Sequence, residues 1–264
     1  MDEVFRRRAR VLLFAGPQAR GDRNGAGAHD NAPGVRLGGT NMIITIDGPA
    51  GTGKSTVAQA TAQALGFDYL DTGAMYRAVG LAALRRGVDL HDAAAVAQVA
   101  RTCRVDFDFD SNPPEPLLDG QRVGSVIRSA DVTHASSVVA TVPEVRRILV
   151  ARQQEIGTQR PNLVSEGRDQ GSVVFPHAEL KFYLDAAPAE RARRRVEQLR
   201  KAGENPDYQE ILRQILARDH RDSTRSAAPL SVPAGAEVID TTDMPVEQVV
   251  AIVVDKARRL MSSR

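Results

Sequence analysis

Short apolar runs alternate with longer segments of helical periodicity along most of this chain, from about residue 42 onward. Such alternation is typical of βαβ units, in which parallel strands are joined by crossover helices. Because parallel sheets are buried, we expect an α/β fold with a parallel core sheet and helices on both faces. The clearest helices cover residues 57–65 and 246–260. The apolar runs predict five strands, at residues 43–46, 68–70, 162–165, 180–184 and 237–239.

The pattern changes between residues 104 and 128. Residues 105–109 alternate polar and apolar side chains with period two, a turn follows at 111–114, and a hairpin is predicted around Asp119-Gly120. We interpret this stretch as a β-rich insert between two helical regions. Such an insert could capture a substrate, or its role could be purely structural.

Residues 1–41 differ from the rest of the chain. They hold seven of the 21 glycines and show no sustained periodicity, which predicts a disordered extension. Arginines at positions 6–8 followed by the apolar residues 11–14 resemble a signal peptide, but that apolar core is too short. An alternative is that the natural chain begins at Met42, directly before the first predicted strand.

Composition limits the class of protein. A hydrophobic content of 42% is ordinary for a soluble globular protein, and the longest apolar stretches, such as 249–254, are far below the ~20 residues of a membrane span. The single cysteine, Cys103, cannot form an internal disulfide, which suits a reducing compartment. We therefore expect a cytoplasmic protein that does not contact membranes, and we expect a monomer.

The charge is unevenly distributed. The whole chain carries +2, and residues 1–41 contain seven Arg against four acids, or +3, so the remainder carries about −1. A nucleic-acid-binding surface would show a clustered basic excess with interleaved aromatic residues, and aromatic residues make up only 4% of this chain. We expect no nucleic-acid partner and a small substrate.

The strongest chemical motif follows the first predicted strand and matches the phosphate-loop pattern G-x-x-x-x-G-K-[ST]. In such a loop, backbone N–H groups and the positive end of the next helix dipole bind a polyphosphate. Lys54 can reach the outer phosphates, and the Ser55 hydroxyl can bind a bridging Mg²⁺. A chance glycine turn would lack the flanking strand and helix. The loop consists of Gly48, Pro49, Ala50, Gly51, Thr52, Gly53, Lys54, Ser55 and Thr56.

Two further clusters follow the second and third predicted strands, at the carboxyl edge where open α/β sheets bind ligands. Thr72 can cap the next helix, and Arg77 could project toward a phosphate held opposite the loop or could simply be solvated. Glu166 lies where an acid can assist Mg²⁺, and Arg168 is placed to meet a phosphate. The alternative for this second pair is a turn held by an internal ion pair.

Arginines are frequent in the second half of the chain. Residues 188–201 form a predicted helix, with Pro188 at its start and Gly203 near its end, which could be a mobile lid over a nucleotide or ordinary solvated surface. Further on, a helical face could neutralise a transferring phosphoryl group, although charged faces are often only solvated. The residues of that face are spaced by three, four and seven: Arg218, Arg221, Asp222 and Arg225.

These motifs occur together in one order, and the combination resembles the bacterial cytidylate kinases. The matching segments are DGPAGTGKS from Asp47, LDTGAMYR from Leu70, EGRDQGSVVFP from Glu166 and RDHRDSTR from Arg218. The resemblance runs from about residue 42 to near the C-terminus. It implies a P-loop nucleoside monophosphate kinase fold with three parts: a core of residues 42–76, 158–187 and 226–264, a monophosphate-binding insert of about 77–157, and a helical lid of about 188–225.

The resemblance also implies an activity. Cytidylate kinases transfer the γ-phosphoryl group of ATP reversibly to CMP or dCMP, with Mg²⁺. Two alternatives stay open: a kinase for another monophosphate, such as UMP or AMP, and a P-loop switch ATPase. The chain lacks the Asn-Lys-x-Asp run of guanine-binding switch proteins, and its arginine-rich second half favours a kinase with two substrates.

Individual roles follow from the same similarity. Ser137, Arg146 and Asp169 match positions that read the cytosine edge, where Asp169 would accept from the exocyclic amine that uracil lacks. The acceptor phosphate would be held by Thr72, Arg77, Arg168 and Arg225, with Asp222 and Arg218 at the ribose and the transferring group. The catalytic charges implied in this way are Lys54, Arg168, Arg218 and Arg225.

Overall fold

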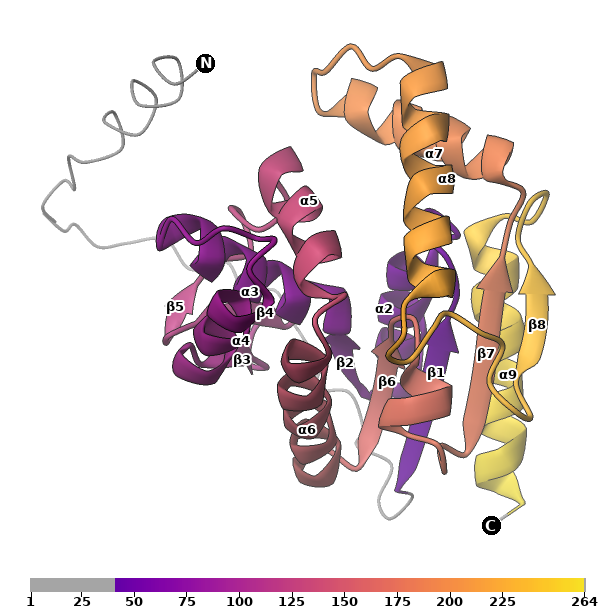
Figure 1. Ribbon diagram of the computed structural model, residues 1–264. Coiled ribbons are helices and arrows are strands. Elements are labelled where there is room, and N and C mark those ends of the chain that lie inside the picture. The colour runs from indigo at the N-terminus through magenta and orange to yellow at the C-terminus, as the bar shows by residue number, and fades with distance from the viewer. Residues whose placement is uncertain (1–40, 264) are drawn as a thin grey trace, which may run out of the picture. The chain divides into compact units, whose positions relative to one another are not determined.

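Five parallel strands form the main sheet of the computed structural model, which describes residues 41–263 (Figure 1). Their order in the sheet is β2-β6-β1-β7-β8, with β1 in the middle. All five strands predicted from the sequence are present, and their ends differ from the prediction by one residue at most. The strands are β1 (Met42–Asp47), β2 (Asp68–Asp71), β6 (Asn162–Glu166), β7 (Leu180–Asp185) and β8 (Glu237–Asp240).

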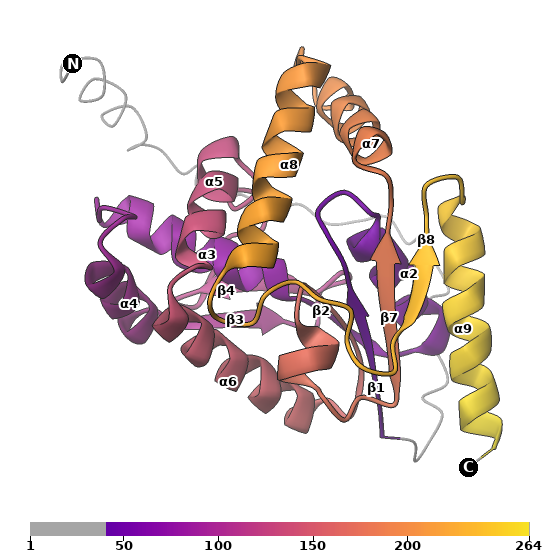
Figure 2. The ribbon, with the colours of Figure 1, turned by 45° about the vertical axis from the view of Figure 1, so that its right-hand side comes forward.

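Helices cover both faces of this sheet, as predicted (Figure 2). Successive side chains of a strand point to opposite faces, so on β6 Leu163 packs in one apolar cluster and Val164 in the other. The cluster around Leu163 includes residues of α3 and α6, whereas the cluster around Val164 includes residues of α2 and α9. These helices are α2 (Lys54–Leu65), α3 (Thr72–Arg85), α6 (Pro143–Gln159) and α9 (Val246–Ser262).

Two helix boundaries differ from the sequence prediction. The helix α2 begins at Lys54, not at residue 57, because Gly53 adopts a left-handed conformation (φ 88°) and turns the chain directly into the helix. The helix α9 continues to Ser262, two residues beyond the predicted end at 260. Between residues 41 and 263, no helix combines the length and the apolarity that crossing a bilayer requires.

The segment between α3 and β6 contains the predicted hairpin within a largely helical region. The hairpin turns at Asp119 and Gly120, whose φ values of 51° and 79° are those of a type I′ turn. The β-rich stretch predicted at residues 104–128 is confirmed, with three strands between two helices, and helices form most of the rest of the segment. Its elements before α6 are α4 (Ala93–Thr102), β3 (Val105–Asp108), β4 (Glu115–Leu118), β5 (Gln121–Arg122) and α5 (Ala130–Val139), with the three strands in one antiparallel sheet.

A pair of helices, α7 (Pro188–Lys201) and α8 (Tyr208–Thr224), stands above the carboxyl ends of the strands (Figure 1). The pair has a small core of its own, made of Ala192, Val196, Ile211 and Ile215. The helix α8 ends at Thr224, so Arg225 lies just beyond it and is not part of the helical face predicted from the spacing. Below this pair, β6 leads into a short π-helix, η1 (Gln170–Val174).

Candidate active site

The loop between β1 and α2 has the backbone conformation of an anion cradle. Gly48, Gly51 and Gly53 all have positive φ, of 143°, 85° and 88°. At Gly48 the constraint is also steric, since a Cβ there would lie 2.0 Å from the carbonyl oxygen of Leu184. The loop therefore requires glycine at this position.

Lys54 is enclosed by this loop. Its side chain is only 5% exposed, and Nζ donates to the carbonyl oxygen of Pro49 at 2.6 Å. Burial, together with the nearby guanidiniums of Arg168 and Arg218, lowers the pKa of Lys54 to about 7. A bound anion would relieve this unfavourable crowding of positive charge.

A hydroxyl and a carboxylate meet at the start of α2. Ser55 Oγ donates to Glu166 Oε1 at 2.6 Å, and Tyr69 Oη donates to the same oxygen at 3.4 Å. Burial and the neighbouring Asp71 carboxylate raise the pKa of Glu166. Within residues 41–263, no three His, Cys, Asp or Glu side chains come together around a metal position. Mg²⁺ bound through nucleotide phosphates needs only one or two protein oxygens, which Ser55 and Glu166 can supply.

The first turn of α3 corrects one prediction. Thr72 does not cap the helix, because the chain already leaves the strand at Asp71, whose Oδ1 accepts from Ala74 N at 2.9 Å. Thr72 is the first helical residue, and its hydroxyl donates to the carbonyl oxygen of Glu166 at 2.7 Å. Arg77 Nη2 pairs with Asp71 Oδ2 at 2.6 Å, so Arg77 faces the carboxyl edge of the sheet.

Three arginines converge on Asp222. Arg168 Nε donates to Asp222 Oδ2 at 3.0 Å, and Arg225 Nη1 lies 3.9 Å from Oδ1. Burial and the neighbouring Arg168 lower the pKa of Arg218 to about 10. Although burial opposes it, the charges of Arg168 and Arg218 hold the pKa of Asp222 below its ordinary value. Of the four residues with this spacing, Asp222 is buried and Arg218 and Arg225 are half-buried beside it, whereas Arg221 is exposed.

Two of the three residues expected to read a base lie in direct contact. Arg146 of α6 forms a buried ion pair with Asp169, which follows β6. Ser137 of α5 is instead joined to α8, since its Oγ accepts from Arg221 Nε at 3.4 Å. Arg225 connects the two clusters, because Arg146 and Asp169 both influence its pKa, which burial lowers.

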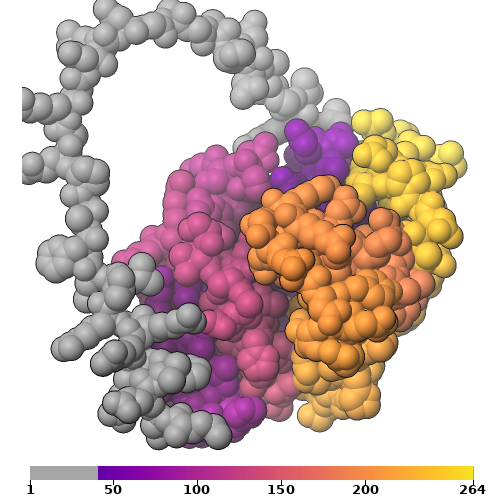
Figure 3. Space-filling view, turned by 90° about the horizontal axis from the view of Figure 1, so that it is seen from above, coloured from indigo at the N-terminus to yellow at the C-terminus, as the bar shows by residue number. Residues whose placement is uncertain are grey.

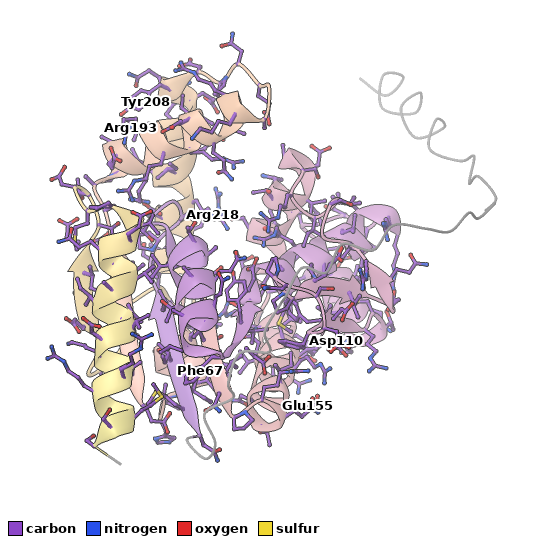
Figure 4. All side chains as sticks on the ribbon, turned by 180° about the vertical axis from the view of Figure 1, so that it is seen from behind. Phe67, Asp110, Glu155, Arg193, Tyr208 and Arg218 are labelled. Carbon is purple, nitrogen blue, oxygen red and sulfur yellow. The ribbon has the colours of Figure 1, made fainter. Side chains whose placement is uncertain are left out.

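A cleft of about 1670 Å³ lies at the carboxyl edge of the sheet, and only some of these residues line it. Its walls include the loop residues 50–56, Ser137 of α5 and Arg218 of α8. Figure 3 looks down on this edge, with α5 in magenta on one side and α7 and α8 in orange on the other. In Figure 4 the labelled Arg218 lies between the outer part of the α7–α8 pair and the helices of the sheet.

Several buried donors around the cleft have no acceptor among residues 41–263. They are Arg77 Nε, Arg146 Nε, Arg218 Nε and Arg225 Nη2. Buried N–H groups without a partner are rare, because each costs about 1–3 kcal/mol of desolvation. Four such guanidiniums near one cleft indicate a site for an anionic ligand that supplies the missing acceptors.

The sequence alone does not show which arginines of α7 are solvated and which are buried, but the structure does. Arg191 is buried: Nε donates to Ala186 O at 2.9 Å, Nη1 donates to Ala50 O at 3.1 Å, and Nη2 pairs with Asp219 at 2.7 Å. Arg191 thus joins the phosphate loop to α8. Arg193, two residues further on, is largely exposed and pairs with Glu190 on the same helix.

Asp47 directly precedes the phosphate loop, and the sequence alone predicts no role for it. Its carboxylate accepts from the backbone N–H groups of Gln170 at 2.8 Å and Gly171 at 2.7 Å. Complete burial raises the pKa of Asp47 to about 6 in spite of these two bonds. Its position directly before the phosphate loop is the only sequence signal that could have identified it, and that position does not reveal the partner segment.

Comparison with known proteins identifies the family. A family model described as cytidylate kinase matches residues 44–259. The cytidylate kinase of Caldanaerobacter subterraneus subsp. tengcongensis is 46% identical over 216 residues, which cover 82% of this chain and 94% of that protein. The cytidylate kinase of Pelotomaculum thermopropionicum is 48% identical over 212 residues, 80% of this chain and 93% of that protein.

A further relative belongs to the same family, whereas a solved structure of a different kinase is only weakly similar. The cytidylate kinase of Mycobacterium avium is 44% identical over 219 residues, 83% of this chain and 96% of that protein. A gluconokinase from Sinorhizobium meliloti 1021 has a TM-score of 0.46 and 16% identity over 84% of this chain and 95% of that one, which is too weak a likeness to support a conclusion. Since the family model covers most of the sequence, the chain belongs to the cytidylate kinase family and is a nucleoside monophosphate kinase.

Proposed function

We propose that this chain transfers the γ-phosphoryl group of ATP to CMP and dCMP, forming ADP with CDP or dCDP. The observation that carries the proposal is a set of arginines with buried, unpaired N–H groups, of which Arg77 and Arg218 line the same cleft as the phosphate loop. One anion site would serve a nucleotide hydrolase. A kinase needs two, one for the donor and one for the acceptor phosphate.

The donor would bind at the phosphate loop. The proposed contacts are the loop residues Gly48, Pro49, Ala50, Gly51, Thr52, Gly53, Lys54, Ser55 and Thr56. All of them except Pro49 can offer a backbone N–H group to the phosphates. Lys54 would exchange its bond to the Pro49 carbonyl for one to a phosphate oxygen. Because its amine is buried among guanidiniums, the phosphate would also restore the charge that burial disfavours.

Kinases of this family use a divalent metal, and we propose that it is Mg²⁺. The Ser55 hydroxyl would hold it, with the Glu166 carboxylate 2.6 Å from that hydroxyl as a direct or water-mediated partner. When bound, Mg²⁺ reduces the negative charge on the phosphate oxygens that it contacts.

The acceptor phosphate would be held by Thr72, Arg77, Arg168 and Arg225. Arg77 and Arg168 already pair with Asp71 and Asp222, so their guanidiniums are oriented before the phosphate arrives. Asp222 and Arg218 would contact the sugar and the transferring group. Since a deoxyribose lacks one hydroxyl, we expect the contact of Asp222 to contribute to binding without being required for dCMP.

The base would be read by Ser137, Arg146 and Asp169. In the Arg146–Asp169 pair the carboxylate is only 5% exposed, and it would accept from the exocyclic amine of cytosine while Arg146 donates to the ring acceptors. Uracil presents an oxygen in place of that amine, which would face a buried carboxylate and leave it unpaired. The cost of an unpaired buried acceptor is the physical basis for rejecting UMP.

Transfer would proceed in line and without a covalent enzyme intermediate. An oxygen of the acceptor phosphate attacks the γ-phosphorus of ATP, and the bond to the β-phosphate oxygen breaks to release ADP. Lys54, Arg168, Arg218 and Arg225 would stabilise the charge on the moving oxygens. The α7–α8 lid, about residues 188–225, would close to exclude water, and the insert of about 77–157 would carry the acceptor.

The cytoplasmic location expected from the lone Cys103 stays a prediction. The monomeric state likewise stays a prediction.

The test is a coupled assay of ADP release with ATP and Mg²⁺ and a panel of monophosphates. We expect CMP and dCMP to accelerate ADP release strongly, and UMP, AMP and TMP to have little effect. Equal acceleration by UMP or AMP would reject the proposed substrate. ADP release that no monophosphate changes would favour the switch ATPase.

A further inference from the structure

Gln170, the residue after Asp169, is fixed from three different elements. Its backbone N–H donates to Asp47 of β1 at 2.8 Å. Its side-chain Oε1 accepts from Ser165 Oγ of β6 at 2.8 Å, and its Nε2 donates to Gln153 Oε1 of α6 at 3.1 Å. The amide is therefore hydrogen-bonded at both ends, to Ser165 of β6 and to Gln153 of α6.

The bond between Gln153 and Gln170 joins the same two parts of the chain as the Arg146–Asp169 ion pair of the proposed base site. Arg146 and Gln153 are seven residues apart on α6, so they lie on the same face about two turns apart. Their partners, Asp169 and Gln170, are consecutive in the chain. Two polar bridges, side by side, thus join α6 to the same segment, and only one of them contains the residues expected to contact a base.

Both amides are deeply buried, with exposures of 0% for Gln153 and 1% for Gln170. Burying an amide costs free energy unless its hydrogen bonds are made, and an apolar pair of similar volume would avoid that cost. Here the Gln153 amide also interacts with the buried hydroxyl of Tyr76, although neither Gln153 Nε2 nor that hydroxyl forms a hydrogen bond of good geometry within residues 41–263. The Tyr76 ring lies 5.5 Å from the Arg146 guanidinium. Two buried amides that bond to each other make this contact directional, which an apolar pair of the same volume would not.

We infer that Gln153 and Gln170 are positioning residues that set the distance and orientation between Arg146 and Asp169, and thereby the discrimination of cytosine from uracil. The inference rests on the proposed function, because it assumes that the Arg146–Asp169 pair reads the base. Neither amide touches the substrate. They act by holding α6 at a fixed place against the segment that carries Asp169.

The experiment compares Q153M and Q170M with a matched control, Q154M. Methionine has nearly the same length as glutamine and removes the polar atoms without leaving a large cavity. Gln154 is the neighbouring residue of α6, and its Nε2 donates to the carbonyl oxygen of Val174 at 3.1 Å. Q154M thus also removes a hydrogen bond between α6 and the η1 segment, but one that is not next to Asp169.

The readouts are kcat and KM for CMP, for UMP and for ATP, together with the thermal midpoint of each variant. Loss of a typical hydrogen bond corresponds to about a fivefold effect, so we expect the KM for CMP to rise about fivefold or more in Q153M and Q170M. The preference for CMP over UMP in kcat/KM should fall by a similar factor. The KM for ATP, kcat at saturating CMP and all parameters of Q154M should change less than about twofold.

Folded Q153M with an unchanged KM for CMP and unchanged preference would overturn the inference. So would an equal rise in the KM values for CMP and ATP, which would show a merely structural role. Q153M removes one hydrogen bond of good geometry and a weaker contact to the Tyr76 hydroxyl, whereas Q170M also removes the bond to Ser165, so Q153M remains informative if Q170M fails to fold. Failure of the proposed function is a separate result, because the unmodified protein would then show no CMP-dependent release of ADP.

Discussion

The donor loop and the acceptor side of the cleft are built in opposite ways. The loop occupies nine consecutive residues, 48–56, and its shape depends on backbone conformation, with left-handed glycines and a Gly48 that has no room for a Cβ. The proposed acceptor side takes side chains from α3, α5, α6, α8 and the segment after β6. A local structure can be recognised as a motif, whereas an assembled one exists only after the elements have packed.

The two regions also treat positive charge differently. Lys54 donates to a neutral carbonyl, and its charge is opposed by burial and by two nearby guanidiniums. The acceptor arginines Arg77, Arg146 and Arg168 each pair with a carboxylate, so most of their charge is balanced before a ligand binds. We therefore expect the donor side to respond to a ligand by changing protonation, and the acceptor side by exchanging partners.

The largest effect expected is that of Lys54→Ala. Because this cation is the one side-chain charge inside the donor loop, its loss should lower kcat by about a thousandfold. The thermal midpoint should stay the same or rise, since a buried lysine with a depressed pKa does not favour the folded state. The measurements are ADP release and thermal unfolding, with Lys181→Ala as control, because Lys181 also donates to a backbone carbonyl but lies at the surface. Wild-type turnover in Lys54→Ala would refute the donor assignment.

Next in size is Arg218→Ala, which tests the acceptor side. Arg218 is half-buried, has a buried Nε without a partner in residues 41–263, and should contribute mainly in the transition state. We expect kcat to fall about a hundredfold while the Kd for ATP changes less than about threefold. Arg213→Ala is the matched control on the same helix, since Arg213 is exposed and pairs only with Glu210 among the contacts within the described chain. An equal loss of kcat and ATP affinity would make Arg218 a donor-binding residue only.

The sequence predicts local structure, such as the donor loop, better than it predicts contacts between distant elements, such as those of the acceptor side. The five strands were found to within one residue because each is a short apolar run between polar segments. The start of α2 was placed too late because Lys54, Ser55 and Thr56 are polar, and the helix there is set by Gly53 and the loop, not by apolar periodicity. Asp71 and Thr72 are both good cap residues, and only the position where the strand ends decides between them.

The acceptor side was predictable only through resemblance. Nothing in the spacing of Ser137, Arg146 and Asp169 indicates that two of them meet, because their contact depends on how the insert packs against the sheet. Burial was equally inaccessible from sequence. Arg191 and Arg193 lie in one arginine run, and only the neighbouring Ala50 and Asp219, distant in sequence, make the first of them part of the interior.

A smaller effect is expected for Asp169→Asn, which tests base reading directly. Asparagine keeps the shape and can donate to the oxygen that uracil presents in place of the amine. We expect the preference for CMP over UMP in kcat/KM to fall about tenfold to a hundredfold, with the KM for ATP little changed. Asp106→Asn is the control, because Asp106 forms another ion pair to α6, with Arg152 at 2.6 Å. An unchanged preference in Asp169→Asn would remove the specificity assignment from this pair.

The smallest effect concerns protonation, and it separates the two sides most directly. Since the pKa of Lys54 is about 7 in the free protein, the amine loses its proton as pH rises above 7, and polyphosphate binding should raise that pKa again. ATP binding should therefore take up protons above pH 7, and ATP affinity should fall by up to about tenfold between pH 7 and pH 8.5. Calorimetry at pH 8 in two buffers of different ionisation enthalpy measures the uptake.

Two controls test whether Lys54 takes up the proton. Lys54→Arg stays charged and should abolish proton uptake on ATP binding. CMP binding should cause no proton uptake, because arginines do not titrate in this range. Proton uptake that survives in Lys54→Arg would mean that another group in the cleft changes protonation, and that the donor and acceptor sides do not differ in the way proposed.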